Sequence, residues 1–146
     1  MSRDEFSAGA VVFSDHPQAG VKVLVIKDSY GRWAFPKGRI EPNEGVPEAA
    51  LRETKEEVGL SALEIVAELG NTDFWYRDRW EHPGETVHKR VQYFLAKAPD
   101  WQHAQINEVE RIQRIHWVSP RELRGIIRYR SLHPVIERAI DHLGQR

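Results

Sequence analysis

The chain has 146 residues and a formal net charge of −1, with basic and acidic residues intermixed, which argues against a general nucleic-acid-binding surface. This length is typical of one domain with a core of its own, so we expect residues 1–146 to form a single domain. There is no cysteine, which excludes a disulfide scaffold and a thiolate zinc site.

We expect neither a secretory signal nor a membrane-spanning segment in this sequence. Acidic residues stand where a secretory signal needs a basic and then an apolar run, and no later stretch is apolar for long enough to span a bilayer. We therefore expect a soluble, cytoplasmic protein.

Ser7–Phe13 and Val21–Lys27 are short runs rich in β-branched residues on either side of a turn-rich loop, a pattern typical of paired strands.

The next segment, residues 28–45, is interrupted by glycine and proline, so only Trp33–Phe35 is expected to form a short strand. Lys37 and Arg39 are the basic residues nearest the helix that follows. Lys37 is a candidate substrate-binding residue, because an ammonium group can neutralise phosphate as a flexible point charge. For Arg39 we favour the simpler interpretation of a solvated loop residue.

Residues 47–58 are predicted to form a helix, with Pro47 in its first turn and Gly59 as its stop. One face is mostly apolar and contains Ala50, Leu51, Thr54 and Val58. Another face groups carboxylates at i, i+3 and i+4, namely Glu53, Glu56 and Glu57. Like charges at this spacing destabilise a helix by about 0.2–0.5 kcal/mol per pair. The residues alone leave two interpretations open: a solvated acidic face, or a site for a hard divalent ion such as Mg²⁺.

The longer stretch from Gly38 to Leu60 resembles the signature of the Nudix hydrolases. The spacing from Gly38 to Glu44, from Glu44 to Arg52-Glu53 and on to Glu56-Glu57 and Gly59 matches that signature. One position departs from it, since Thr54 stands where the family usually has a bulky aliphatic residue. This difference affects the apolar face and leaves the carboxylates unchanged.

The resemblance implies a metal site. Glu53, Glu56 and Glu57 are expected to bind Mg²⁺, for which Mn²⁺ is a substitute, with Glu57 as the central ligand. Glu53 is a metal ligand or the base for the attacking water. The backbone carbonyl of Gly38 is expected to complete the oxygen shell.

The resemblance also implies two supporting residues and a fold. Arg52 is expected to orient Glu53, and Glu44 to pair with Arg52 and brace the loop against the helix. The fold class is α/β, a Nudix-type α/β/α sandwich with a mixed β-sheet. The order of the predicted elements, with strands on both sides of a helix and two helices near the end, independently favours such a sandwich.

After the helix, residues 63–69 are predicted to form a strand, followed by a polar, turn-rich segment with many aromatic residues. Phe74, Trp75, Tyr76 and Trp80 lie within seven positions there. Aromatic rings stack on nucleobases with about 1–3 kcal/mol per base, and we select Trp75 and Tyr76 as candidate substrate-binding residues. The alternative, that some of these rings pack in the core, is expected for at least half of them.

Residues 87–97 alternate as a half-buried strand in which Lys89 and Tyr93 share a face. An ammonium group and a ring on one face suit a phosphate and a base, so both are candidate substrate-binding residues. The segment also resembles, more weakly, the lysine-containing strand of Nudix members that act on dinucleoside polyphosphates.

The last third resembles the segment in which many family members place one further acidic residue. Glu108 and Glu110 are both candidates, and Glu110 is favoured as a catalytic residue. A short helix is predicted from Ser119-Pro120 to about residue 127, and a final amphipathic helix begins at Pro134.

These observations predict a magnesium-dependent hydrolase that cleaves phosphoanhydride bonds in nucleoside diphosphate derivatives. Dinucleoside polyphosphates such as diadenosine tetraphosphate are the favoured substrates. Two other enzymes remain as alternatives: a nucleoside triphosphate pyrophosphatase that clears damaged nucleotides, and a diphosphoinositol polyphosphate phosphatase. A third alternative is a non-catalytic nucleotide-binding module, although such modules usually lose a carboxylate. The expected partner is a small-molecule nucleotide substrate, and we expect the protein to bind neither nucleic acid nor a membrane. We expect it to be a monomer or a homodimer.

Overall fold

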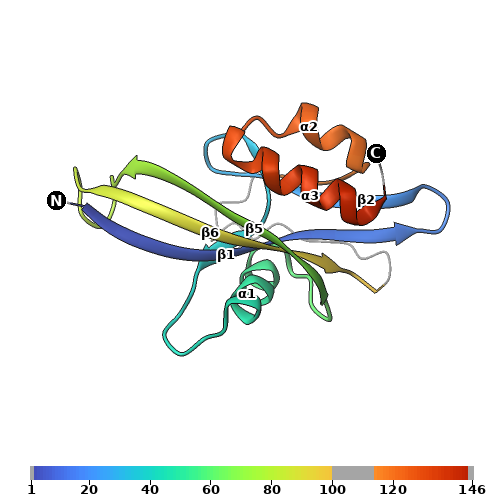
Figure 1. The fold of residues 1–146 in the computed structure, drawn as a ribbon, viewed down its shortest axis with the longest axis horizontal. Coiled ribbons are helices and arrows are strands. Elements are labelled where there is room, and N and C mark those ends of the chain that lie inside the picture. The colour runs from blue at the N-terminus through green and yellow to red at the C-terminus, as the bar shows by residue number, and fades with distance from the viewer. Residues whose placement is uncertain (1, 100–113, 145–146) are drawn as a thin grey trace.

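The computed structural model describes residues 2–99 and 114–144, which form a curved β-sheet with helices on both faces (Figure 1). The strands are β1 (Ser2–His16), β2 (Gly20–Lys27), β3 (Trp33–Ala34), β4 (Lys37–Arg39), β5 (Glu64–Arg77), β6 (Thr86–Lys97) and β7 (Arg114–Val118). The helices are α1 (Val46–Val58), α2 (Leu123–Ile126) and α3 (His133–Leu143). Single turns of 3₁₀ helix, Pro120–Glu122 and Arg130–Leu132, precede α2 and α3.

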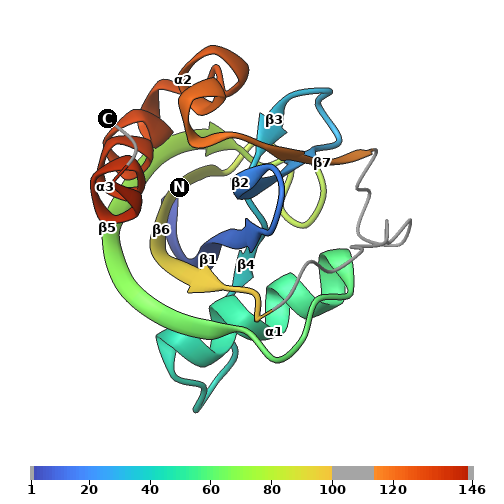
Figure 2. The same ribbon diagram turned by 90° about the vertical axis from the view of Figure 1, so that its right-hand side faces the viewer.

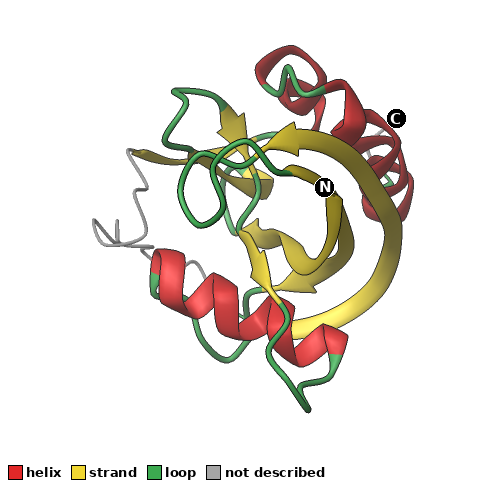
Figure 3. Cartoon of the chain, turned by 90° about the vertical axis from the view of Figure 1, so that its left-hand side faces the viewer, coloured by secondary structure: helices red, strands yellow, loops and turns green. Residues whose placement is uncertain are grey.

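The sheet is mixed, with the order β3-β2-β1-β6-β5, while β4 pairs with β1 and β7 pairs with β2. Among the strand pairs of residues 2–99 and 114–144, only β1 and β6 are parallel, and their ladder runs from Ser2 opposite Thr86 to Phe13 opposite Lys97. Helix α1 covers one face, and α2 and α3 cover the other (Figures 2 and 3). The predicted α/β/α sandwich with a mixed sheet is confirmed.

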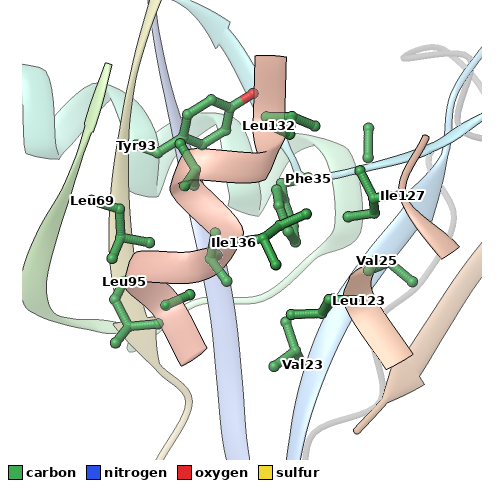
Figure 4. Packing of buried hydrophobic residues seen from close by; sticks show 14 of the residues in the cluster. Val23, Val25, Phe35, Leu69, Tyr93, Leu95, Leu123, Ile127, Leu132 and Ile136 are labelled. Atoms are coloured by element: carbon green, nitrogen blue, oxygen red, sulfur yellow. The ribbon is translucent and has the colours of Figure 1, made fainter. Parts of the chain in front are cut away.

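Two apolar layers hold the helices to the sheet. The larger one lies under α2 and α3, where Phe35, Leu95 and Ile136 are almost completely buried (Figure 4). The other lies between α1 and the opposite face of the sheet, and includes Val58 and Phe94. The stripe of α3 faces the larger layer as its sequence predicts, with Val135, Ile136, Ala139 and Ile140 buried.

Helix α1 begins one residue before the predicted start and ends at Val58 as predicted. Gly45 caps its amino end, and Gly59 ends it in the left-handed conformation at φ 76°, where its N–H donates to the carbonyl of Lys55. Thr54 is fully buried, and its hydroxyl donates to the carbonyl of Ala50 at 2.8 Å. This internal hydrogen bond satisfies the hydroxyl at a position where an aliphatic residue is usual.

Three strand predictions need correction. Strand β1 begins at Ser2, well before Ser7, because its first residues pair with β6 in the parallel ladder. Strand β5 continues through the aromatic segment to Arg77, because residues 70–77 pair with β6 in unbroken register, and the two irregularities of the ladder lie earlier, between Ile65 and Gly70. The short strand after β2 ends at Ala34, and β4 was not predicted.

None of the helices in the described part of the chain is both long and apolar enough to cross a membrane.

Candidate active site

Glu53 on α1 lies directly against the backbone of Gly38 on β4. A methyl group added at Gly38 would fall 2.0 Å from Cδ of Glu53 and 2.1 Å from Oε2, so no larger residue fits beside this carboxylate. Glu53 and Glu57 are almost completely buried, while the side chain of Glu56 is 45% exposed. The fold thus brings together the helix and the glycine that the sequence predicted to share a site.

Arg52 connects the carboxylates of this region. Its Nε and Nη2 donate to Glu44 at 2.7 and 3.0 Å, and its Nη1 donates to Glu53 at 2.8 Å and to Glu56 at 3.1 Å. Nη2 also donates to the carbonyl of Arg39 at 2.8 Å, which ties α1 to the end of β4. The hydrogen bond from Arg52, and then one from the backbone N–H of Glu41, hold the pKa of Glu44 below its usual range.

The donor set in this region suits a hard divalent ion, since it consists of carboxylates and a backbone carbonyl. In the arrangement described for residues 2–99 and 114–144, no three acidic or histidine side chains converge closely enough to hold a metal ion. Glu53 and Glu56 instead share Nη1 of Arg52. The residues that would hold a cation are Glu53, Glu56, Glu57 and the carbonyl of Gly38, and their ligand roles remain predictions.

A cavity of about 770 Å³ opens on the face of the sheet that α2 and α3 cover. Its floor, defined here as Lys37, Lys89 and Tyr93, belongs to β4 and β6. Two exposed aromatic residues, Tyr30 at 73% and Trp80 at 72%, belong to its rim. In β4 the side-chain position of Gly38 faces Glu53 of α1, whereas Lys37 lines the cavity, so the floor and the carboxylates of α1 lie on opposite faces of this short strand.

The two lysines of the floor are partly buried. Burial first, and then the charge of Lys37, lower the pKa of Lys89 to about 8, whereas the carboxylate of Glu5 acts to raise it. Burial and the nearby charge of Glu57 raise the pKa of the Tyr93 hydroxyl well above its usual range. Tyr93 therefore connects the cavity electrostatically with the acidic helix.

The two aromatic residues selected in β5 lie on opposite faces of the sheet. The Tyr76 hydroxyl donates to Glu5 Oε2 at 2.8 Å, and burial followed by this hydrogen bond raises its pKa to about 12. The Trp75 ring stacks on His88, with centroids 4.4 Å apart and planes 8° apart, and is 61% exposed. His88 and Lys89 are neighbours in β6 and point to opposite faces. Both residues line the cavity, but only Tyr76 has its ring on the side of Lys89.

The family model for the NUDIX domain matches residues 4–141 of the chain. The chain belongs to the Nudix family. Nudix domains hydrolyse phosphoanhydride bonds in pyrophosphate-containing substrates and generally use divalent cations, so this chain is a Nudix hydrolase.

Known proteins agree with this assignment. A Mycobacterium tuberculosis protein with the provisional name mutator protein MutT4 is 34% identical over 148 residues, covering 95% of this chain and 57% of that protein. The bis(5'-nucleosyl)-tetraphosphatase [asymmetrical] of Mus musculus is 25% identical over 138 residues, covering 90% of each. A crystal structure of a Caenorhabditis elegans Ap4A hydrolase binary complex superimposes with a TM-score of 0.75 at 24% identity, covering 97% of this chain and 99% of that one.

Several residues around the site of this Nudix hydrolase were not predicted. Arg39, interpreted from sequence as solvated, donates to both Glu5 and Glu81. At the rim, the Tyr129 hydroxyl donates to Asp28 at 2.6 Å. The sequence contains no local signal for these contacts, because each one joins residues from distant parts of the chain.

The candidate for a further acidic residue, Glu110, and its alternative, Glu108, lie outside the described residues.

Proposed function

We propose that this Nudix hydrolase uses Mg²⁺ to cleave a phosphoanhydride bond in dinucleoside polyphosphates, with diadenosine tetraphosphate as a representative substrate. The observation that carries the proposal is the cavity on the other side of β4 from the acidic helix, which combines two lysines on its floor with aromatic side chains on its walls and rim. Its volume of about 770 Å³ lies in the upper part of the range of small-molecule sites.

The arrangement of charge suits a polyphosphate chain with a nucleoside at one or both ends. Lys37 and Lys89 are placed to neutralise phosphate oxygens that face the floor. Tyr76, Tyr30 and Trp80 offer rings of the kind on which nucleobases stack. The name of the mouse relative, which covers 90% of both chains, supports the same substrate class.

In the proposed reaction, Arg52 and Glu44 hold Glu53 against Gly38. Glu53 would there accept a proton from water or bind the metal. Magnesium ions held by Glu53, Glu56, Glu57 and the carbonyl of Gly38 would supply Lewis-acid chemistry and lower the pKa of water. The lysines of the floor stabilise charge on the oxygens of the scissile phosphates.

The test is product analysis with diadenosine polyphosphates, nucleoside triphosphates, nucleoside diphosphate sugars and diphosphoinositol polyphosphates, with Mg²⁺ present and after chelation. We expect ATP to be released from diadenosine tetraphosphate, and the rate to fall at least about 100-fold on chelation. Replacing Mg²⁺ with Mn²⁺ after chelation should restore activity.

Other results would point elsewhere. A preference for triphosphates with release of pyrophosphate would move the assignment to clearance of damaged nucleotides. Turnover only of diphosphoinositol polyphosphates would assign the third enzyme class, and turnover of none of these compounds would overturn the proposal.

A further inference from the structure

Glu5 is a buried carboxylate next to the cavity floor, with no assigned role in the reaction. It lies on β1 and is only 7% exposed. In the parallel ladder it stands directly opposite Lys89 of β6, and Tyr76 of β5 reaches it from the other side of that strand. The carboxylate therefore lies on the cavity side of the sheet, below the place where we propose that phosphate binds.

Both oxygens of Glu5 accept hydrogen bonds. Oε2 accepts from the Tyr76 hydroxyl at 2.8 Å, and Oε1 accepts from Nη2 of Arg39 and, at 3.2 Å, from Nη2 of Arg3. Burial acts to raise the pKa of Glu5, but the Tyr76 hydrogen bond and the charges of Arg39 and Lys89 outweigh burial, and the pKa is lowered. Glu5 is therefore a fixed anion among cations.

A nearby anion stabilises the charged form of Lys89. Partial burial disfavours its charged form, and Lys37 and Arg39 of β4 add like charge that also lowers its pKa. Glu5 is the group on the neighbouring strand that opposes these effects. A neutral lysine would bind phosphate weakly, so the charge state of Lys89 decides how well the floor works.

We propose that Glu5 is a positioning residue that keeps Lys89 in its cationic form on the cavity floor and fixes the hydroxyl of Tyr76 beside it. The proposal rests on the proposed function in one respect, namely that substrate phosphate binds over the floor. Glu5 does not need to touch the substrate, because it acts through the two side chains next to it.

This role predicts an unusual pH dependence for Glu5→Gln. The single oxygen of the glutamine amide can still accept from Tyr76, its N–H₂ then faces the donors of Arg3 and Arg39, and the amide provides no charge for Lys89. Lys89 then loses its proton at lower pH than in the unmodified enzyme, so KM should be about three- to tenfold higher at pH 8. At pH 6.5 Lys89 is protonated in both proteins, and the variant should have an equal or lower KM because one carboxylate near the phosphates is gone.

The experiment measures KM and kcat from pH 6 to 9 with whichever pyrophosphate-containing substrate the enzyme cleaves fastest. Glu5→Asp keeps the charge and should return the profile toward that of the unmodified enzyme. Glu85→Gln is the matched control, because Glu85 also pairs with Arg3, at 2.8 Å, whereas Glu5 is the carboxylate that accepts from Tyr76 and stands opposite Lys89. Its KM profile should be unchanged.

A second readout does not depend on activity. The side-chain NMR signal of Lys89 in lysine-labelled protein, assigned by its loss in Lys89→Arg, should titrate at lower pH in Glu5→Gln. A KM increase that is the same at every pH, or an unchanged Lys89 titration, would overturn the proposal. If diadenosine tetraphosphate is not the substrate, only the substrate class fails, because the Lys89 titration and the KM profile on the actual substrate still report on Glu5.

Discussion

At Gly38, the absence of a side chain decides where the carboxylate of Glu53 can lie. A methyl group there would fall within 2.4 Å of every atom of that carboxyl group. Glu53 is nearly buried and held by Arg52, so it cannot swing away into water without losing that hydrogen bond. Gly38→Ala must therefore move Glu53, and we expect kcat to fall about 100-fold, as is typical for a catalytic group displaced by about 1 Å.

Gly45 provides the matched control for this substitution. A methyl group at Gly45 would also meet a carboxylate, with Glu48 Oε2 at 2.4 Å. Glu48 is exposed and can rotate into solvent, so Gly45→Ala should retain kcat within about twofold. Steady-state kinetics of both variants, with thermal melting to confirm folding, measures the difference. Equal losses in the two variants would contradict the placement of Glu53.

At the scale of elements, the loop between β5 and β6 is held by Asp78. Its Oδ1 accepts from the backbone N–H of Trp80 at 2.9 Å, and its Oδ2 accepts from Arg3 at 2.6 Å and from the N–H of His82 at 3.2 Å. The Trp80 N–H and then Arg3 hold the pKa of Asp78 far below its ordinary value of 3.8. The loop that presents Trp80 to the cavity therefore depends on this carboxylate being ionised.

The sign of the pH effect follows from this lowered pKa. The stabilisation by Asp78 is present above its ordinary pKa of 3.8 and is lost as pH falls toward the lower folded-state value. We expect Asp78→Asn to lower Tm by several degrees at pH 7, because the new amide N–H₂ faces the donors of Arg3 and His82. The difference in Tm should shrink below about pH 4. Asp15→Asn, at an exposed position of β1, is the control and should leave Tm unchanged.

The elements differ in how well the sequence predicts them. Helix α1 was predicted almost completely, because Pro47, Gly59 and the spacing of its apolar residues act locally. Strand β6 was also predicted, because its sequence alternates in character, although residues 93–96 are buried on both faces. The carboxyl-terminal half of β5 was not, because Asn71, Asp73 and Arg77 are exposed and resemble loop residues. They are extended because they pair with β6, and that pairing is not visible in the segment itself.

At the scale of the whole molecule, the proposed metal-binding face and the cavity differ in the same way: the sequence predicts one better than the other. The acidic helix and Gly38 are close in sequence, so a local motif predicted them. The cavity is assembled by long-range contacts: Arg3 and Asp78 are 75 residues apart, and Asp28 and Tyr129 are 101 apart. Glu5 meets Lys89 only because β1 and β6 run parallel. Sequence patterns of period two or four give the face of a residue, but they do not give its partner on another strand.

The proposed metal site predicts that a bound cation stabilises the whole folded domain. Its donors come from α1 and β4, so they are brought together only in the folded state, and a bound cation must raise the free energy of unfolding. At a Mg²⁺ concentration about 100 times its Kd, the increase is about 2.7 kcal/mol, or about 5–10 °C in Tm for a domain of this size. Melting curves with Mg²⁺ and with EDTA measure it directly, without any substrate.

Substitution of a predicted ligand tests whether that residue is responsible for the Mg²⁺-dependent stabilisation. Glu57→Gln should lose most of the Mg²⁺-dependent increase in Tm and most turnover, yet melt near the unmodified enzyme in EDTA, because the substitution keeps the size of a nearly buried side chain. Glu64→Gln, at an exposed position of β5, should keep the full increase. A full Mg²⁺-dependent increase in Glu57→Gln would place the cation elsewhere on the molecule. A loss of Tm in EDTA would mean that Glu57 supports the fold in addition to any metal, and its loss of turnover would then no longer identify a ligand.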